Sequence, residues 1–133
     1  MELKPKILVV EDESIIAMDL QVTLLRMGYE VTSVVNNALA AIQKVEQDKP
    51  DIVLMDIMLG GSLDGIEAAK IISYHHTIPI IYVTALKDED TMKRAYLPDP
   101  FLFLMKPYSE NDLGNAIEMM LKTTSMKKPG NSP

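Results

Sequence analysis

The sequence has no cysteine, no net positive charge and no long apolar run, and each absence excludes a class of protein. Without cysteine there are no disulfides, no thiolate nucleophiles and no zinc–sulfur sites. The net charge of −6 leaves no basic surface for general binding of nucleic acids or anionic membranes. No apolar run approaches the roughly 20 residues of a transmembrane helix, and the four apolar residues after "MELKPK" are too few for a signal peptide. We therefore predict a cytoplasmic protein that contacts neither nucleic acid nor membrane directly.

Length and composition indicate one globular domain. The chain has 133 residues, of which 47% are hydrophobic and 24% charged, a balance that supports a core of its own. From position 124 onward the apolar periodicity is lost. We expect a folded domain over residues 1–123 and a flexible tail or linker stub over residues 124–133.

Short apolar runs alternate with longer helical patterns, which is typical of an α/β fold with a parallel sheet. The predicted strands are residues 6–10, 30–35, 51–55, 79–84 and 101–106. The first, third and fourth are too uniformly apolar for a sheet with one wet face, so helices should cover both faces. Five β/α units predict a doubly wound, flavodoxin-like parallel sheet with strand order 2-1-3-4-5 and five helices over both faces.

The predicted helices have recognisable ends. Gly28 is placed to end the first helix, Asn37 to cap the second, and Asp64 to open the third as part of a capping-box pattern. The fourth helix is expected over residues 88–96, and the fifth begins after Ser109.

Polar side chains stand at the ends of four predicted strands. Glu11 and Asp12 follow the first strand, Asp56 the third, Thr84 ends the fourth and Lys106 the fifth. In the predicted strand order the first and third strands are neighbours, and ligands bind beyond the carboxyl ends of such strands. We therefore expect three acids, a hydroxyl and an ammonium group to meet at one edge of the sheet.

This set of groups suits a cation and a single phosphoryl group. Three adjacent carboxylates can all remain ionised only if a cation lies between them. Without a cation, the pKa of at least one of the carboxyl groups rises. Oxygen ligands without nitrogen or sulfur donors favour Mg²⁺. Lys106 can neutralise a phosphate oxygen, and Thr84 can donate a hydrogen bond to another. No Gly-rich loop follows any strand to hold a nucleoside phosphate, so an aspartate is the natural phosphoryl acceptor.

The segments "VVEDES", "VLMDIML", "DGIEAA", "IIYVTA" and "FLFLMKPYSENDL" resemble, in order and over residues 6–122, a response regulator receiver domain with a chemotaxis-regulator-like fold. The resemblance implies that Asp56 is the phospho-acceptor. It also implies that Glu11, Asp12 and Asp56 bind Mg²⁺ together with the backbone carbonyl of Met58.

The same resemblance implies roles for the other residues and for partners. Lys106 contacts the phosphoryl group, Thr84 and Phe103 are the switch residues, and the Lys106–Pro107 bond is expected to be cis. A sensor histidine kinase or phosphotransfer protein is the expected donor in two-component signalling or a phosphorelay. The face of the fourth helix, fifth strand and fifth helix would then contact an effector protein, a fused output domain or a second copy. Such a domain is no enzyme in the ordinary sense, since it assists only its own phosphorylation and dephosphorylation.

Two positions close to the predicted site carry apolar side chains. Met58 and Leu86 stand where many receivers carry polar side chains that position the hydrolytic water, which predicts slow loss of the phosphoryl group.

A phosphorylation-independent pseudo-receiver remains an alternative. A phosphohydrolase of the haloacid-dehalogenase-like family is disfavoured because it would carry an acid at position 58. A nucleotide-binding flavodoxin-like domain is disfavoured by the acidic first loop, which would repel phosphates.

Overall fold

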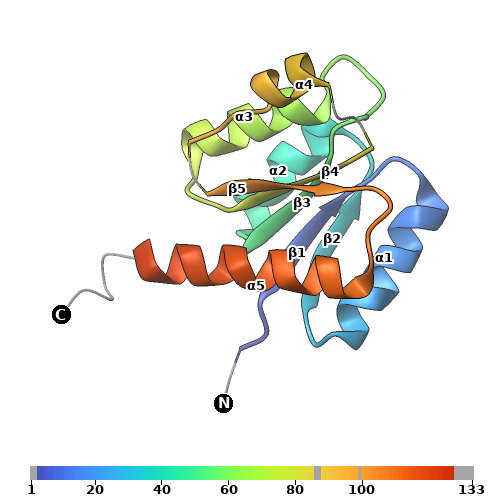
Figure 1. Ribbon diagram of the computed structural model, residues 1–133, viewed down its shortest axis with the longest axis vertical. Coiled ribbons are helices and arrows are strands. Elements are labelled where there is room, and N and C mark those ends of the chain that lie inside the picture. The colour runs from blue at the N-terminus through green and yellow to red at the C-terminus, as the bar shows by residue number, and fades with distance from the viewer. Residues whose placement is uncertain (1–2, 86–87, 99, 128–133) are drawn as a thin grey trace.

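The computed structural model describes residues 3–85, 88–98 and 100–127. Five parallel strands form one sheet in the order β2-β1-β3-β4-β5, with helices on both faces (Figure 1). The predicted doubly wound, flavodoxin-like α/β fold is therefore confirmed. No helix in the described part of the chain is long and apolar enough to cross a membrane. The elements are β1 (Lys6–Val10), α1 (Ser14–Arg26), β2 (Glu30–Val35), α2 (Ala38–Asp48), β3 (Ile52–Asp56), α3 (Gly65–His75), β4 (Ile80–Thr84), α4 (Glu89–Arg94), β5 (Phe101–Met105) and α5 (Glu110–Lys127).

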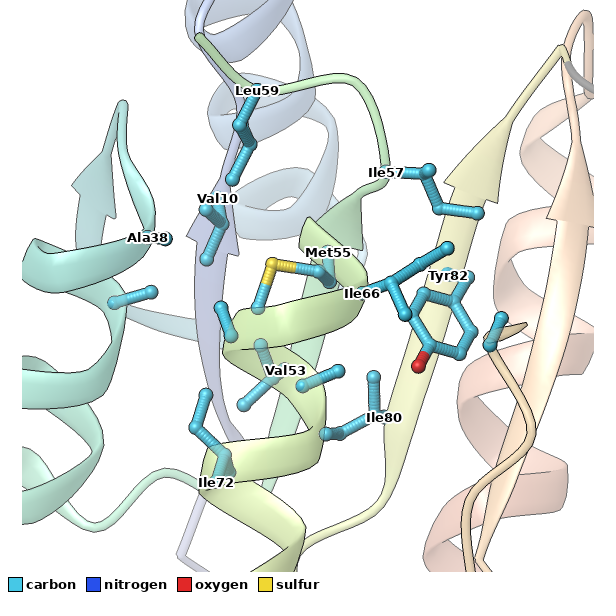
Figure 2. Close-up of a cluster of buried hydrophobic side chains, with 14 of the residues drawn as sticks. Val10, Ala38, Val53, Met55, Ile57, Leu59, Ile66, Ile72, Ile80 and Tyr82 are labelled. Carbon is cyan, nitrogen blue, oxygen red and sulfur yellow. The ribbon is translucent and has the colours of Figure 1, made fainter. Parts of the chain in front are cut away.

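The central strands are buried on both faces. Because successive residues of a strand point to opposite sides, Leu8 and Val10 pack toward α2 and α3, whereas Ile7 and Val9 pack toward α1 and α5. Figure 2 shows the first of these two clusters between the sheet and α3. Every residue of β3 and of β4 is buried, so these strands hold the residues at their carboxyl ends in fixed positions.

The predicted helix ends are confirmed. Gly28 follows α1 with a φ of 97°, a conformation that glycine adopts without steric cost. The Asn37 side chain accepts a hydrogen bond from the backbone N–H of Ala40 at the start of α2. Asp64 and Glu67 form a complete capping box at the start of α3.

Some predicted boundaries are wrong by one or two residues. Strand β3 extends to Asp56, because this residue still pairs with Val83 of β4. Helix α4 is shorter than residues 88–96, since Asp88 serves as its N-cap and Ala95 as its C-cap.

Helix α5 continues past the predicted start of the tail. It is helical to Lys127, four residues beyond position 123. The hydroxyl of Thr123 donates to the Met119 carbonyl one turn earlier and so remains part of the helix. The division into a domain over residues 1–123 and a tail over residues 124–133 stays a prediction, and positions 128–133 lie outside the described residues.

Gly65 brings α3 into close contact with β3. A Cβ atom at this position would collide with the backbone carbonyl of Asp56 and crowd Ile57. The Gly65 N–H donates to the Ile57 carbonyl at 3.1 Å, so the first residue of α3 is hydrogen-bonded to the segment that follows β3. Only a residue without a side chain allows the two backbones to approach this closely.

We expect Gly65→Ala to lower the free energy of unfolding by at least about 2 kcal/mol, because the colliding atoms are backbone and cannot rotate away. Urea denaturation followed by circular dichroism measures this. Gly60→Ala is the matched control, since a Cβ at Gly60 meets no atom within 4 Å. Equal stability of the two variants would show that α3 is not held against β3 in this way.

Candidate functional site

The residues of the candidate site lie at the carboxyl ends of four strands. Glu11 directly follows β1, and its N–H donates to the Val35 carbonyl at the end of β2. Asp56 is the last residue of β3 and Thr84 the last residue of β4. Lys106 directly follows β5, and its N–H donates to the Thr84 carbonyl at 2.8 Å. Strand pairing thus places these residues along one edge of the sheet.

Three carboxylates form a compact cluster at this edge. One oxygen from each of Glu11, Asp12 and Asp56 lies within 4.8 Å of the other two. Glu11 and Asp56 are buried, with 4% and 5% of their surface exposed, whereas Asp12 is exposed. The Met58 N–H donates to Asp56 Oδ1 at 3.0 Å, which leaves Oδ2 to face the neighbouring groups.

One cationic side chain reaches this cluster within the described ranges. Lys106 Nζ lies 3.4 Å from Glu11 Oε1 and 3.8 Å from Asp56 Oδ2. Burial, a hydrogen bond shared with Glu11 and the negative charge of Glu11 raise the pKa of Asp56, which lies at about 7. The Met58 N–H and Lys106 act in the opposite direction but do not compensate. The rise in one carboxyl pKa expected for a crowded acid cluster is therefore present.

The donor set fits a hard divalent cation. The cluster offers carboxylate oxygens only, with no histidine or cysteine among the grouped residues. Mg²⁺ prefers such oxygen ligands and commonly keeps several waters, which leaves coordination positions for a phosphoryl oxygen. A cation here would also lower the pKa of Asp56 by favouring its charged form.

The residues predicted as switch elements lie on the two last strands. Thr84 is buried, with 1% of its surface exposed. Phe103 is half-buried and pairs in register with Tyr82, two residues before Thr84, so it does not line the carboxylate cluster. The Phe103 and Tyr82 rings stack with a centroid separation of 5.3 Å. The Lys106–Pro107 peptide bond is cis, as predicted.

The structure describes one of the two apolar residues that were predicted to slow hydrolysis. Met58 directly follows Ile57 at the edge of the site, and 62% of its surface is exposed. Leu86 lies outside the described residues. The predicted role of the Met58 carbonyl as a metal ligand stays a prediction, because the contact that the structure provides is made by its N–H.

Two residues near the site were not singled out from the sequence. Gly65 contacts the Asp56 backbone, and its position directly after Asp64 in "DGIEAA" was the available signal. Tyr82 stacks on Phe103, but in the sequence it appears as one more apolar residue of a buried strand.

Comparisons with known proteins agree with this geometry. The sequence model of the family described as "Response regulator receiver domain" matches residues 7–118. Transcriptional regulatory protein PdtaR of Mycobacterium tuberculosis is 37% identical over 114 residues, which are 86% of this chain and 55% of PdtaR. The chain thus spans about half the length of this relative.

Solved structures show the same fold. The signal receiver domain of a modulated diguanylate cyclase from Desulfovibrio desulfuricans superposes with a TM-score of 0.88 at 36% identity, covering 95% of this chain and 100% of that chain. The receiver domain of sensor histidine kinase PA1611 from Pseudomonas aeruginosa, described with a magnesium ion coordinated in its active site cleft, has a TM-score of 0.80 at 26% identity. The two structures superpose over 90% of this chain and 99% of the PA1611 receiver chain. Together with the family match over most of the sequence, these similarities show that the chain belongs to the response regulator receiver domain family.

Proposed function

We propose that this receiver domain accepts a phosphoryl group on Asp56 from the phosphohistidine of a sensor histidine kinase or a phosphotransfer protein. A carboxylate oxygen of Asp56 forms the new O–P bond while the N–P bond of the phosphohistidine breaks and its electron pair returns to the imidazole. The observation that carries this proposal is the position of Asp56, a buried acid with Lys106 at 3.8 Å in a cluster of three carboxylates.

The neighbouring residues have separate parts in this reaction. Glu11, Asp12 and Asp56, together with the Met58 carbonyl, would hold Mg²⁺, which supplies positive charge to the attacking carboxylate and the transferred group. Lys106 contacts a phosphoryl oxygen and offsets its charge. The Met58 N–H orients Asp56 by donating to Oδ1, so that the carboxylate is positioned before the donor arrives.

The new phosphoryl oxygens draw the Thr84 hydroxyl inward, and Phe103 moves into the space that Thr84 leaves. The surface formed by α4, β5 and α5 changes shape as a result. In similar transcriptional regulators the matched region makes up 55% and 51% of the protein. The partners we propose are therefore an effector protein or an output domain, with a second copy as a further option.

Incubation with acetyl phosphate and Mg²⁺ should add one phosphoryl group to the protein, as measured by intact mass. We expect no adduct without Mg²⁺ and none in Asp56→Asn, because the first lacks charge compensation and the second lacks the nucleophile. Asp51→Asn is the control, since Asp51 is an exposed acid that binds the Lys6 N–H at the other end of the sheet.

If no adduct forms while Mg²⁺ still binds, a second incubation with a phosphorylated histidine phosphotransfer protein separates the two remaining possibilities. Absence of phosphoryl transfer there as well would favour the pseudo-receiver, which acts as an interaction module without phosphorylation.

Without divalent cations, stability should fall as the pH rises from 5 to 8. The Asp56 pKa is about 7 in the folded protein against 3.8 in the reference state. Between these values the folded protein holds a proton that the unfolded chain has lost, and the stabilisation that this provides disappears as the pH rises through 7. The stabilisation of Asp56→Asn relative to the unchanged protein should therefore increase by about 2–3 kcal/mol between pH 5 and pH 8. Urea denaturation in EDTA at both values measures this difference. Saturating Mg²⁺ should reduce it, and a difference that is the same with and without Mg²⁺ would contradict a metal site at Asp56.

Met58→Asn should shorten the half-life of the phosphorylated form by about two- to ten-fold. A polar side chain at this exposed position can hold the attacking water beside Asp56, which methionine cannot do. The decay of phosphoprotein after removal of the donor gives the half-life. Met119→Asn replaces a similarly exposed methionine on α5 and should leave the half-life unchanged. A half-life for Met58→Asn that is equal to or longer than that of this control contradicts the role of Met58.

A further inference from the structure

Helix α4 has few anchors in the protein core. None of its residues, Glu89–Arg94, is buried. Burial begins directly after the helix, where Ala95 and Leu97 join the hydrophobic cluster beneath α2 and α3. A six-residue helix without a buried face is not stable by itself, so its orientation depends on the contacts at its ends.

One such contact is an ion pair with the start of α3. Arg94 Nη2 lies 2.9 Å from Asp64 Oδ2, and this is the one ion pair of α4 within the described ranges. Asp64 also caps α3 by accepting the Glu67 N–H through Oδ1. Although partial burial alone would raise it, the hydrogen bonds from Glu67 and Arg94 hold the pKa of Asp64 below its ordinary value. Asp64 therefore stays ionised and bound to Arg94 at neutral pH.

Asp64 is also connected to the phospho-acceptor through the backbone. The next residue, Gly65, packs against the Asp56 carbonyl and donates its N–H to the Ile57 carbonyl. Any displacement of the backbone at Asp56 and Ile57 must therefore move the start of α3. This connection reaches Arg94 without passing through Thr84 or Phe103.

Tyr82 has a buried hydroxyl group on which the charge of the Asp64 carboxylate acts. Its side chain is fully buried, and its hydroxyl has no hydrogen-bond partner among the described residues. The ring lies beside Ile66 of α3 (Figure 2). Burial raises the pKa of Tyr82, the charge of Asp64 raises it further and Arg94 lowers it, so both charges act on this hydroxyl. A buried hydroxyl without an acceptor is unfavourable, and a nearby carboxylate would relieve this.

We infer that Asp64, Arg94 and Tyr82 form a latch that regulates α4 and has two positions. In the position observed here, Asp64 binds Arg94 and so joins the end of α4 to the start of α3. In the other position, Arg94 is released and the Tyr82 hydroxyl donates to Asp64. Phosphorylation of Asp56 favours this second position because it displaces the start of α3. The inference rests on the proposed phosphorylation of Asp56 and adds a route to α4 that is separate from the two switch residues.

Two variants should change the affinity for a phosphoryl mimic in opposite directions. Arg94→Gln weakens the observed position, so beryllofluoride with saturating Mg²⁺ should bind about two- to five-fold more tightly. Tyr82→Phe removes the hydrogen bond of the released position and the unsatisfied hydroxyl of the observed one, so binding should be weaker by a similar factor. Isothermal titration calorimetry measures both affinities.

The chain offers a matched control and a test of pairing. Arg26 forms an ion pair with Glu110 between α1 and α5, and its side chain is 56% exposed against 51% for Arg94, so Arg26→Gln should leave the affinity unchanged. Asp64→Asn preserves the cap, because asparagine caps helices as well as aspartate does, but removes the charge. Its effect should not add to that of Arg94→Gln if the two residues act as a pair.

Amide exchange in the protein without beryllofluoride tests the latch independently of phosphorylation. Residues Glu89–Arg94 should exchange about two-fold or more faster in Arg94→Gln than in Arg26→Gln. Equal exchange, or shifts of the same sign for Arg94→Gln and Tyr82→Phe, would overturn the latch. If the unchanged protein binds no beryllofluoride and accepts no phosphoryl group, the proposed function fails instead, and the amide exchange still decides whether Arg94 holds α4.

Discussion

The burial of Glu11 and Asp56 beside a single ammonium group is the constraint on which the rest of the structure depends. Lys106 lies within 4 Å of both carboxylates, yet the pKa of Asp56 remains near 7 because burial and Glu11 outweigh it. Such an arrangement stores unfavourable charge that a cation or a phosphoryl group with its cation can relieve. It persists only because β1, which Glu11 directly follows, and β3, which ends in Asp56, are buried on both faces and cannot move apart.

Rigidity and mobility are distributed unequally across the sheet. The strands β1, β3 and β4 are almost entirely buried, whereas β5 is mostly half-buried and α4 has no buried residue. Local opening costs least where few apolar contacts hold an element, so α4 and β5 are the parts that a change at Asp56 can move without unfolding the core. The charged groups at the ends of β1 and β3 are therefore held in fixed positions, whereas α4 and β5 can move.

The sequence predicts what depends on local chemistry and misses what depends on long-range packing. Strand order, the caps at Asn37 and Asp64, and the acids at one edge follow from apolar runs, cap residues and chain order. The ion pair of Asp64 with Arg94 joins positions 30 residues apart, and the Tyr82 hydroxyl becomes unusual only once neighbouring side chains surround it. Neither leaves a periodic signal, because each depends on how α3, α4 and β4 pack together.

The magnitudes of these interactions assign different parts to the acceptor site and the latch. An ion pair between partly exposed side chains, such as Asp64 with Arg94, contributes about 0.2–1 kcal/mol, so it can shift a two-state equilibrium only a few-fold. Moving an equilibrium from 1:99 to 99:1 requires about 5.5 kcal/mol, which is far more than one surface contact contributes. In the mechanism that we propose, phosphorylation of the acceptor site therefore drives the change, and the inferred latch sets how much of the population is already in the released position beforehand. Substitutions at Asp64, Arg94 or Tyr82 would then adjust the response without altering the residues that we propose for the phosphoryl transfer.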